Sequence, residues 1–284
     1  MNMQKIKDFF KVISRNKQAL VGLALLIFFI GMGIAGNLIN VDMTVNFEQR
    51  YQGPSLQHIL GTDYAGRDTF LQLVLGSKDV LLIGFFSALF TMIIGFLIGA
   101  TAGLVGGWVD AVLMFITDLF LTVPSFPLMM MFAATFNITN NIAFSMVLSI
   151  FSWAGLARSI RAQMLSLKER EYIVVCRAMG LKTSYILIKE ILPNITSYLA
   201  INFIMIIQSS ITSSVGLMLL GLSPYSPTNW GMMLNLAIKN TGGIFNPKGY
   251  LYMLSPMACL ILFQMACIFF SSGLDEALNP RLRS

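Results

Sequence analysis

Charged, histidine and cysteine residues are scarce in this sequence. Asp, Glu, Lys and Arg make up 11% of its 284 residues and there is one histidine, whereas an ordinary soluble domain is about 25% charged. The three cysteines, Cys176, Cys259 and Cys267, show neither a disulfide framework pattern nor metal-ligand spacing. The glycine-rich loop Gly-x-x-x-x-Gly-Lys-Ser/Thr, which holds nucleotide phosphates, does not occur. We therefore expect no metal, catalytic or nucleotide site in this chain.

Hydrophobic residues, in contrast, make up 56% of the chain, and the mean hydropathy is +0.74. They occur in long blocks, which is typical of an integral membrane protein. Basic residues of membrane proteins gather on the cytoplasmic side. The net charge of +6 is therefore better interpreted as a topology signal than as affinity for nucleic acid.

Six apolar blocks predict an all-α protein with six transmembrane helices. They cover residues 19–39, 80–105, 112–136, 142–157, 193–222 and 250–270. The first is expected to be a retained helix rather than a cleaved signal peptide, because its apolar core is too long. Glycines at helical spacing in the second block favour close helix packing. Pro124 and Pro127 lie inside the third block, where neighbouring helices are expected to satisfy the freed carbonyls.

The connecting segments differ in charge. Residues 1–17, 158–192 and 271–284 hold 14 of the 19 basic residues, and residues 40–78 and 223–249 hold the other five. The positive-inside rule therefore predicts that both termini and the central basic loop are cytoplasmic. The two other segments are predicted to be outer loops.

The central basic loop contains a short predicted helix that ends at a glycine, which is a common helix stop. Its candidate residues are Glu171, Tyr172, Val174, Val175, Cys176, Arg177, Ala178, Met179 and Gly180. The segment is apolar nearly all round, so we expect it to need a socket that no domain of this chain supplies. Another polypeptide is then the expected partner. An amphipathic linker resting on the membrane surface is the alternative.

The fifth block carries a polar band near its middle, which lipid would not tolerate if exposed. Asn202, Gln208, Ser209 and Ser213 are the candidate path residues there. They either line a wet cavity or belong to small-residue helix packing with hydroxyls bonded to their own helix. In the third block, Asp118 is either a buried structural acid near the inner interface, the favoured interpretation, or part of a gate.

The first outer loop carries a dense polar motif, His58-Ile-Leu-Gly-Thr-Asp-Tyr-Ala-Gly-Arg-Asp68. Its candidate residues are His58, Gly61, Thr62, Asp63, Gly66, Arg67 and Asp68. We expect Asp63, Arg67 and Asp68 to form a local network that shapes the loop. His58 is expected to order the loop or cap a helix rather than bind metal. Contact with an external binding protein is the alternative role for the acidic and arginine residues.

The chain resembles a family on five motifs in order. The outer motif is similar to the His-x-Leu-Gly-Thr-Asp-x-x-Gly-Arg-Asp signature of the dipeptide/oligopeptide/nickel permeases of ATP-binding-cassette (ABC) importers. The others are Arg170-Glu-Tyr172 with Arg177-Ala-Met-Gly180 and Ile191-Leu-Pro-Asn194, Leu220-Gly-Leu222, Trp230-Gly-Met-Met-Leu234, and the tail from Gly273 to Arg283. Within the family, the chain looks like the second, C-type permease.

This resemblance implies a type I ABC importer-like permease domain over residues 18–284, after a cytoplasmic segment 1–17, in a bacterial inner or plasma membrane. The short helix at 171–180 would be the coupling helix that docks on an ATPase. The implied partners are a B-type permease, two ABC ATPase subunits, which bind ATP and Mg²⁺, and an extracytoplasmic binding protein. The implied cargo is a dipeptide or oligopeptide, with nickel or an oligosaccharide as alternatives.

The chain also departs from the family pattern. Val174, Val175 and Cys176 stand where the family has Glu-Ala-Ala, so a salt bridge from that acid is lost, although an apolar helix still fits a groove. Phe115 replaces a commonly basic residue. Two other function classes stay open: an ion-coupled secondary transporter and a structural membrane subunit. The first usually shows several buried charges or repeated halves, and the second leaves the motifs unexplained.

Overall fold

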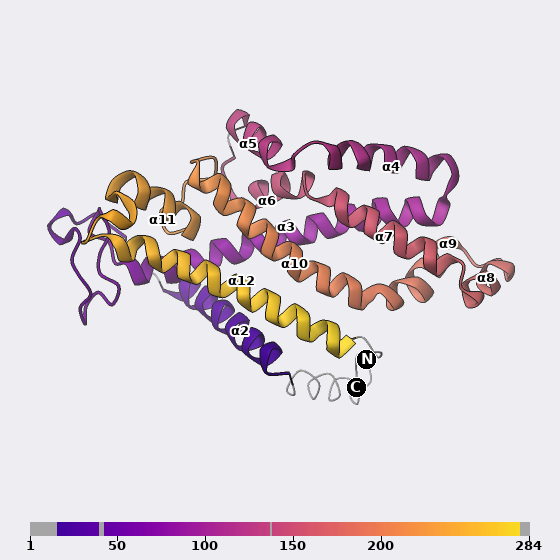
Figure 1. Ribbon diagram of the computed structural model, residues 1–284, viewed down its shortest axis with the longest axis horizontal. Helices are drawn as coiled ribbons and strands as arrows, with labels where there is room; N and C mark the ends of the chain where they lie inside the picture. The colour runs from indigo at the N-terminus through magenta and orange to yellow at the C-terminus, as the bar shows by residue number, and fades with distance from the viewer. Residues whose placement is uncertain (1–15, 40–42, 137, 279–284) are drawn as a thin grey trace.

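The computed structural model describes residues 16–39, 43–136 and 138–278. In that part of the chain every regular element is helical, and the only β-type pairing is an isolated bridge between Thr62 and Asp68. The helices form an elongated bundle (Figure 1). The short helix α8 lies at one end of the bundle, and the loop that follows α2 lies with α11 at the other end. The predicted all-α membrane fold is confirmed.

Among the described residues, four helices are long and apolar enough to cross a membrane by themselves. They are α2 (Lys17–Leu38), α3 (Thr69–Val105), α10 (Leu192–Leu219), which the short α9 (Thr183–Tyr185) and a π-helix (Ile186–Ile191) extend, and α12 (Tyr250–Leu278). Side chains cap the first two: Asn16 accepts from the Ala19 N–H at 3.1 Å, and Asp68 from the Leu71 N–H at 2.8 Å. Such caps satisfy backbone donors that the first turn leaves unpaired.

The other two predicted spans are bent. Helices α4 (Gly107–Thr122) and α5 (Ser125–Thr135) meet at 83°, and α6 (Asn141–Ile150) and α7 (Trp153–Lys168) meet at 56°. The first break lies at Pro124, where the preceding Val123 is extended, as a residue before proline prefers. The expectation of one continuous helix through Pro124 is therefore wrong. The count of six spans holds if each bent pair is one span.

Several helices extend beyond their apolar blocks, and α12, for example, continues to Leu278 in the predicted tail. Helix α3 begins at Thr69, so residues 69–78, assigned above to an outer loop, are helical. Helix α7 continues to Lys168, so residues 158–168 of the predicted basic loop are helical too. Both extensions are polar in part, and a hydropathy pattern does not detect a helix that leaves the hydrocarbon.

Close packing of α3 on α7 depends on glycine. A Cβ atom at Gly99 would lie 2.4 Å from the Ala157 carbonyl oxygen, and one at Gly103 would lie 2.4 Å from the Met164 Cβ. Small residues let backbones approach in this way. The expected role of these glycines in close helix packing is confirmed. This packing holds α7 against the long α3.

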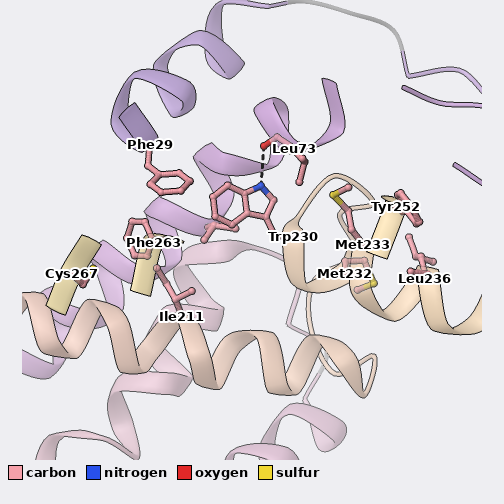
Figure 2. Packing of buried hydrophobic residues seen from close by; sticks show 12 residues of the cluster. Phe29, Leu73, Ile211, Trp230, Met232, Met233, Leu236, Tyr252, Phe263 and Cys267 are labelled. Atoms are coloured by element: carbon pink, nitrogen blue, oxygen red, sulfur yellow. Dashed lines mark hydrogen bonds between the residues drawn. The ribbon is translucent and has the colours of Figure 1, made fainter. Parts of the chain in front are cut away.

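The hydrophobic core near the α11 end is built around Trp230 (Figure 2). Its indole Nε1 donates to the Leu73 carbonyl oxygen at 2.9 Å, so the buried polar atom has a partner. The Phe29 ring packs edge-on against Trp230 and Phe263, with centroids 5.6 and 5.5 Å apart. This core joins α11 (Trp230–Leu236) to α2, α3 and α12.

Candidate functional site

The short helix predicted in the basic loop is present as α8 (Glu171–Ala178). It begins after Arg170, which is extended, and Gly180 follows its end with φ of +74°. The N–H of Leu181 donates to the Cys176 carbonyl at 3.2 Å, and that of Gly180 to the Arg177 carbonyl at 2.9 Å. Glycine adopts the left-handed conformation of such a stop without a Cβ clash.

One face of α8 packs on the bundle of its own chain. Ile173 is fully buried, in a cluster with Met164 of α7 and with Ile186 and Ile191 of the π-helix, and Cys176 is partly buried against it. The expectation that no part of this chain supplies a socket is therefore wrong for this face. The sequence pattern missed it because Ile173 and the two isoleucines of the π-helix lie in short segments that are separate in the sequence.

The opposite face of α8 is exposed and apolar. Val174, Val175 and Met179 are 53, 55 and 72% exposed. Tyr172 is half-exposed, and its hydroxyl accepts from Asn194 Nδ2 at 3.3 Å. The remaining predicted residues of this site, Glu171, Arg177, Ala178 and Gly180, are exposed as well. An exposed apolar face at the tip of a bundle is the kind of surface that binds another protein or a membrane surface, so both alternatives for this segment stay predictions.

The same surface continues beyond α8. Leu181, Tyr185 and Ile188 line a shallow hollow of about 450 Å³ together with Lys182 and Lys189. Tyr185 and Ile188 are 47 and 57% exposed. Sequence analysis did not single them out, although two large apolar residues three apart between lysines were a usable signal.

The predicted polar band on α10 divides between two faces. Ser210 and Ser214 are buried in the bundle, whereas Ser209 and Thr212 are exposed. Asn202, Gln208 and Ser213 lie between these extremes. Two of the predicted side chains bond back to their own helix: Asn202 Nδ2 donates to the Tyr198 carbonyl at 2.9 Å and Ser209 Oγ to the Ile206 carbonyl at 3.1 Å. The back-bonded side chains of one alternative are therefore present, and the wet cavity of the other stays a prediction.

Helix α12 adds a polar side chain to this open face. Gln264 Nε2 donates to Thr212 Oγ1 at 2.8 Å and to the Gln208 carbonyl at 3.3 Å. Gln264 was not predicted, because one glutamine in an apolar block gives no pattern. These two hydrogen bonds join α10 and α12 on the face where Ser209 is exposed.

Asp118 is not a buried acid. It forms an ion pair with Arg158 of α7, and both side chains are more than half exposed. Three residues further along α7, Arg161 forms a second pair, in which its Nη2 donates to Asp110 Oδ2 at 2.5 Å. Asp110 and Asp118 are eight residues apart, on one face of α4, and two ion pairs therefore bridge α4 and α7.

In the loop before α3, the predicted motif residues lie together in a buried network. Asp63 is fully buried and accepts from Arg67 Nε at 2.9 Å and from Gln72 Nε2 at 3.0 Å. Burial by itself lowers the pKa of Arg67, but the charge of Asp63 and its hydrogen bond, with smaller contributions from Tyr64 and Tyr252, together raise the pKa above its ordinary value. Burial raises the pKa of the neighbouring Tyr64 hydroxyl. The raised pKa keeps the Arg67 guanidinium charged beside Asp63.

The remaining motif residues close the turn. His58 Nδ1 lies 2.8 Å from Asp68 Oδ2, the carboxylate that caps α3, and Thr62 Oγ1 accepts from the Gln52 N–H at 2.8 Å. Gly61 and Gly66 have φ of +73° and +78°. Among the residues that the structure describes, no three His, Cys, Asp or Glu side chains gather as a possible metal site.

Comparison with known proteins gives consistent matches. A family model described as a binding-protein-dependent transport system inner membrane component matches residues 95–284, and one described as the N-terminal TM domain of oligopeptide transport permease C matches residues 5–54. A putative peptide permease protein of Brucella suis is 35% identical over 80% of this chain and 74% of its own length. The dipeptide transport system permease protein DppC of Alkalihalophilus pseudofirmus and the oligopeptide transport system permease protein OppC of Bacillus subtilis are each 30% identical over 98% of this chain and 90% of theirs.

Proposed function

Because the chain belongs to the family of binding-protein-dependent transport system inner membrane components, we propose that it forms one half of the translocation path of an ATP-driven importer of dipeptides or oligopeptides. It is a C-type peptide permease by its resemblance to the named relatives. The other half of the path would come from a B-type permease. Two cytoplasmic ATPase subunits and an external binding protein complete the proposed assembly.

The exposed apolar face of α8 carries this proposal. Val175 and Met179 would enter a groove of one ATPase subunit, as large buried side chains do at the centre of interfaces generally. The chain itself supplies no catalytic site in this scheme. ATP would be bound and hydrolysed by the partner subunits.

The buried face of α8 provides the route by which ATPase closure would move the spans. Ile173 contacts the cluster that includes Met164 of α7 and Ile191 of the π-helix, and the π-helix continues directly into α10. Since packed interiors transmit displacement rather than absorb it, a shift of α8 would tilt α7 and α10 together.

The open polar face of α10 is the proposed lining of the path. Polar groups on a lipid-facing surface are costly, so Ser209, Thr212 and Gln264 would face water or the partner permease. The exposed Asp118–Arg158 pair is proposed to lie on the same path. With α8 facing the ATPases, the His58–Asp68 loop would face the binding protein, and both termini would be cytoplasmic.

Peptide cargo has the support of the relatives' names, whereas no relative reported above is named for nickel or oligosaccharides. An ion-coupled secondary transporter and a purely structural subunit lose their support, since the family is one of binding-protein-dependent transport.

The coupling role is tested by changing Val175 and Met179 to Asp together. We expect peptide uptake to be lost while ATP hydrolysis and membrane insertion persist, because a charged face no longer fits an apolar groove. Uptake of a labelled tripeptide and ATPase activity are measured in reconstituted vesicles.

The matched control is Val175→Ile with Met179→Leu, which keeps the face apolar. Wild-type uptake by the aspartate variant would remove the coupling role of α8. A detergent-solubilised complex that contains no ATPase subunit and hydrolyses no ATP would refute the importer assignment as a whole.

A further inference from the structure

A groove of about 600 Å³ lies between α2, α3, α10 and α12, on side chains that the transport proposal does not use. Only Asn37 and Lys78, among its thirteen lining residues, carry strongly polar side chains. Its rim is open, since Ile30, Ile34 and Phe85 are about half exposed, and its floor reaches residues that are fully buried. The groove is therefore an apolar slot that opens sideways from the bundle.

The two polar residues stand together at one end of the groove. Lys78 Nζ donates to Asn37 Oδ1 at 2.5 Å. In the described part of the chain no carboxylate forms a salt bridge with Lys78. The adjacent Asp79 instead accepts hydrogen bonds from Asn141 at 2.9 Å and from Ser226 at 3.1 Å. The ammonium group is exposed, so it is available to an anion at the mouth of the groove.

The position of this end along the bundle matches the membrane surface. Asn37 is next to the last residue of α2, and Lys78 precedes the apolar run of α3 that begins near residue 80. Lysine near the end of a span places its ammonium at the headgroup level. From Asn37 the groove follows α2 down to Leu26.

The depth of the groove corresponds to one leaflet. Eleven residues separate Leu26 from Asn37, which is about 16 Å along a helix that rises 1.5 Å per residue. The hydrocarbon core of a bilayer is about 30 Å thick, so one leaflet is about half of that. The polar end therefore lies at the interface and the apolar end near the midplane.

We propose that this groove binds one anionic phospholipid from the leaflet on the α11 side of the bundle. Its phosphate contacts Lys78, and one acyl chain lies along Ile34 and Ile30. A partner helix would leave the Lys78 ammonium without an anion, whereas one phospholipid supplies both an apolar chain for the slot and a phosphate for Lys78. A peptide finds no hydrogen-bond partner along these walls. The inference depends on the membrane location of the chain and not on its cargo.

The test uses the intact complex, extracted mildly from nanodiscs that contain phosphatidylglycerol, with native mass spectrometry to measure retained lipid. Lys78→Ala is expected to lower phosphatidylglycerol retention about fivefold, the effect of one lysine at an anionic surface. Ile34→Trp, which fills the slot, is expected to remove retention of both phosphatidylglycerol and phosphatidylcholine. The matched control is Lys239→Ala, since Lys239 is also exposed but lies outside the groove.

Thermal unfolding of each variant shows whether it is folded. Lys78→Ala removes the charge and Ile34→Trp fills the slot, so the two variants test the headgroup contact and the chain contact separately. If both Lys78→Ala and Ile34→Trp retain phosphatidylglycerol at the wild-type level, the proposal is overturned. An Ile34→Cys variant with a photoactivatable phosphatidylglycerol gives the second measurement. A cross-link to the lipid supports the lipid site, and a cross-link to the partner permease instead overturns it.

Discussion

At the scale of single residues, the loop before α3 is held by positions that admit few substitutes. Asp63 and Arg67 are buried as an ion pair with additional hydrogen-bond partners. Removing one partner of such a pair leaves an uncompensated buried charge, which is costly. Gly66 combines a positive φ with close contact to the Asn46 backbone. These positions give the loop one shape, and that shape places the cap of α3.

Gly66→Ala is predicted to destabilise the loop strongly. A Cβ atom there would lie 1.7 Å from the Asn46 carbonyl oxygen, and the left-handed conformation alone costs a residue other than glycine about 1–2 kcal/mol. A lower midpoint of thermal unfolding of the purified complex is the measurement.

Gly53→Ala is the matched control, since a Cβ atom at Gly53 has no neighbour within 4 Å and its φ is ordinary. Equal midpoints for the two variants would contradict the tight turn at Gly66.

At the scale of elements, α8 has two faces with different tasks. Ile173 attaches it to α7 and to the π-helix before α10, and Val175 with Met179 stays exposed. The helix is too short to be stable alone, since isolated helices below about 12–15 residues are marginal. Its buried face must therefore keep it folded, while its exposed face is free to bind.

Ile173→Ala is predicted to loosen α8 from the bundle, because truncating a buried isoleucine costs about 2–5 kcal/mol. Faster amide hydrogen exchange across residues 171–178 measures this. Val175→Ala, on the exposed face, should leave exchange unchanged. If both variants exchange alike, the two-faced description of α8 is wrong.

At the scale of the whole molecule, the two ends of the bundle are chemically distinct. One end carries α8 and exposed apolar side chains beside basic ones. The other carries α11 and the buried network of the His58–Asp68 loop. An importer needs this asymmetry, because it meets an ATPase on one side and a delivered cargo on the other.

Cysteine labelling is predicted to place these ends on opposite sides of the membrane. In a variant whose Cys176, Cys259 and Cys267 are replaced by Ser, Leu56→Cys should react with an impermeant maleimide in intact cells, since Leu56 is fully exposed. Glu169→Cys, at an exposed position just before α8, should react only after permeabilisation. Labelling of the second site in intact cells would reverse the proposed orientation.

The sequence alone determined the class of the fold, its six apolar blocks and the position of α8. These features depend on local composition: hydropathy over about twenty residues, a glycine with positive φ, and basic residues near span ends. The family was equally accessible, because motifs such as the one from His58 to Asp68 are contiguous in the chain.

Only the tertiary structure decided which side chains meet across segments. It broke the third span at Pro124, paired Asp118 with Arg158 on another helix, and buried Ile173 while leaving Val175 exposed. It also brought Asn37 and Lys78 together, 41 residues apart. The physical reason is that burial and pairing are set by packing between helices distant in sequence, and a hydropathy pattern carries no information about which helix faces which.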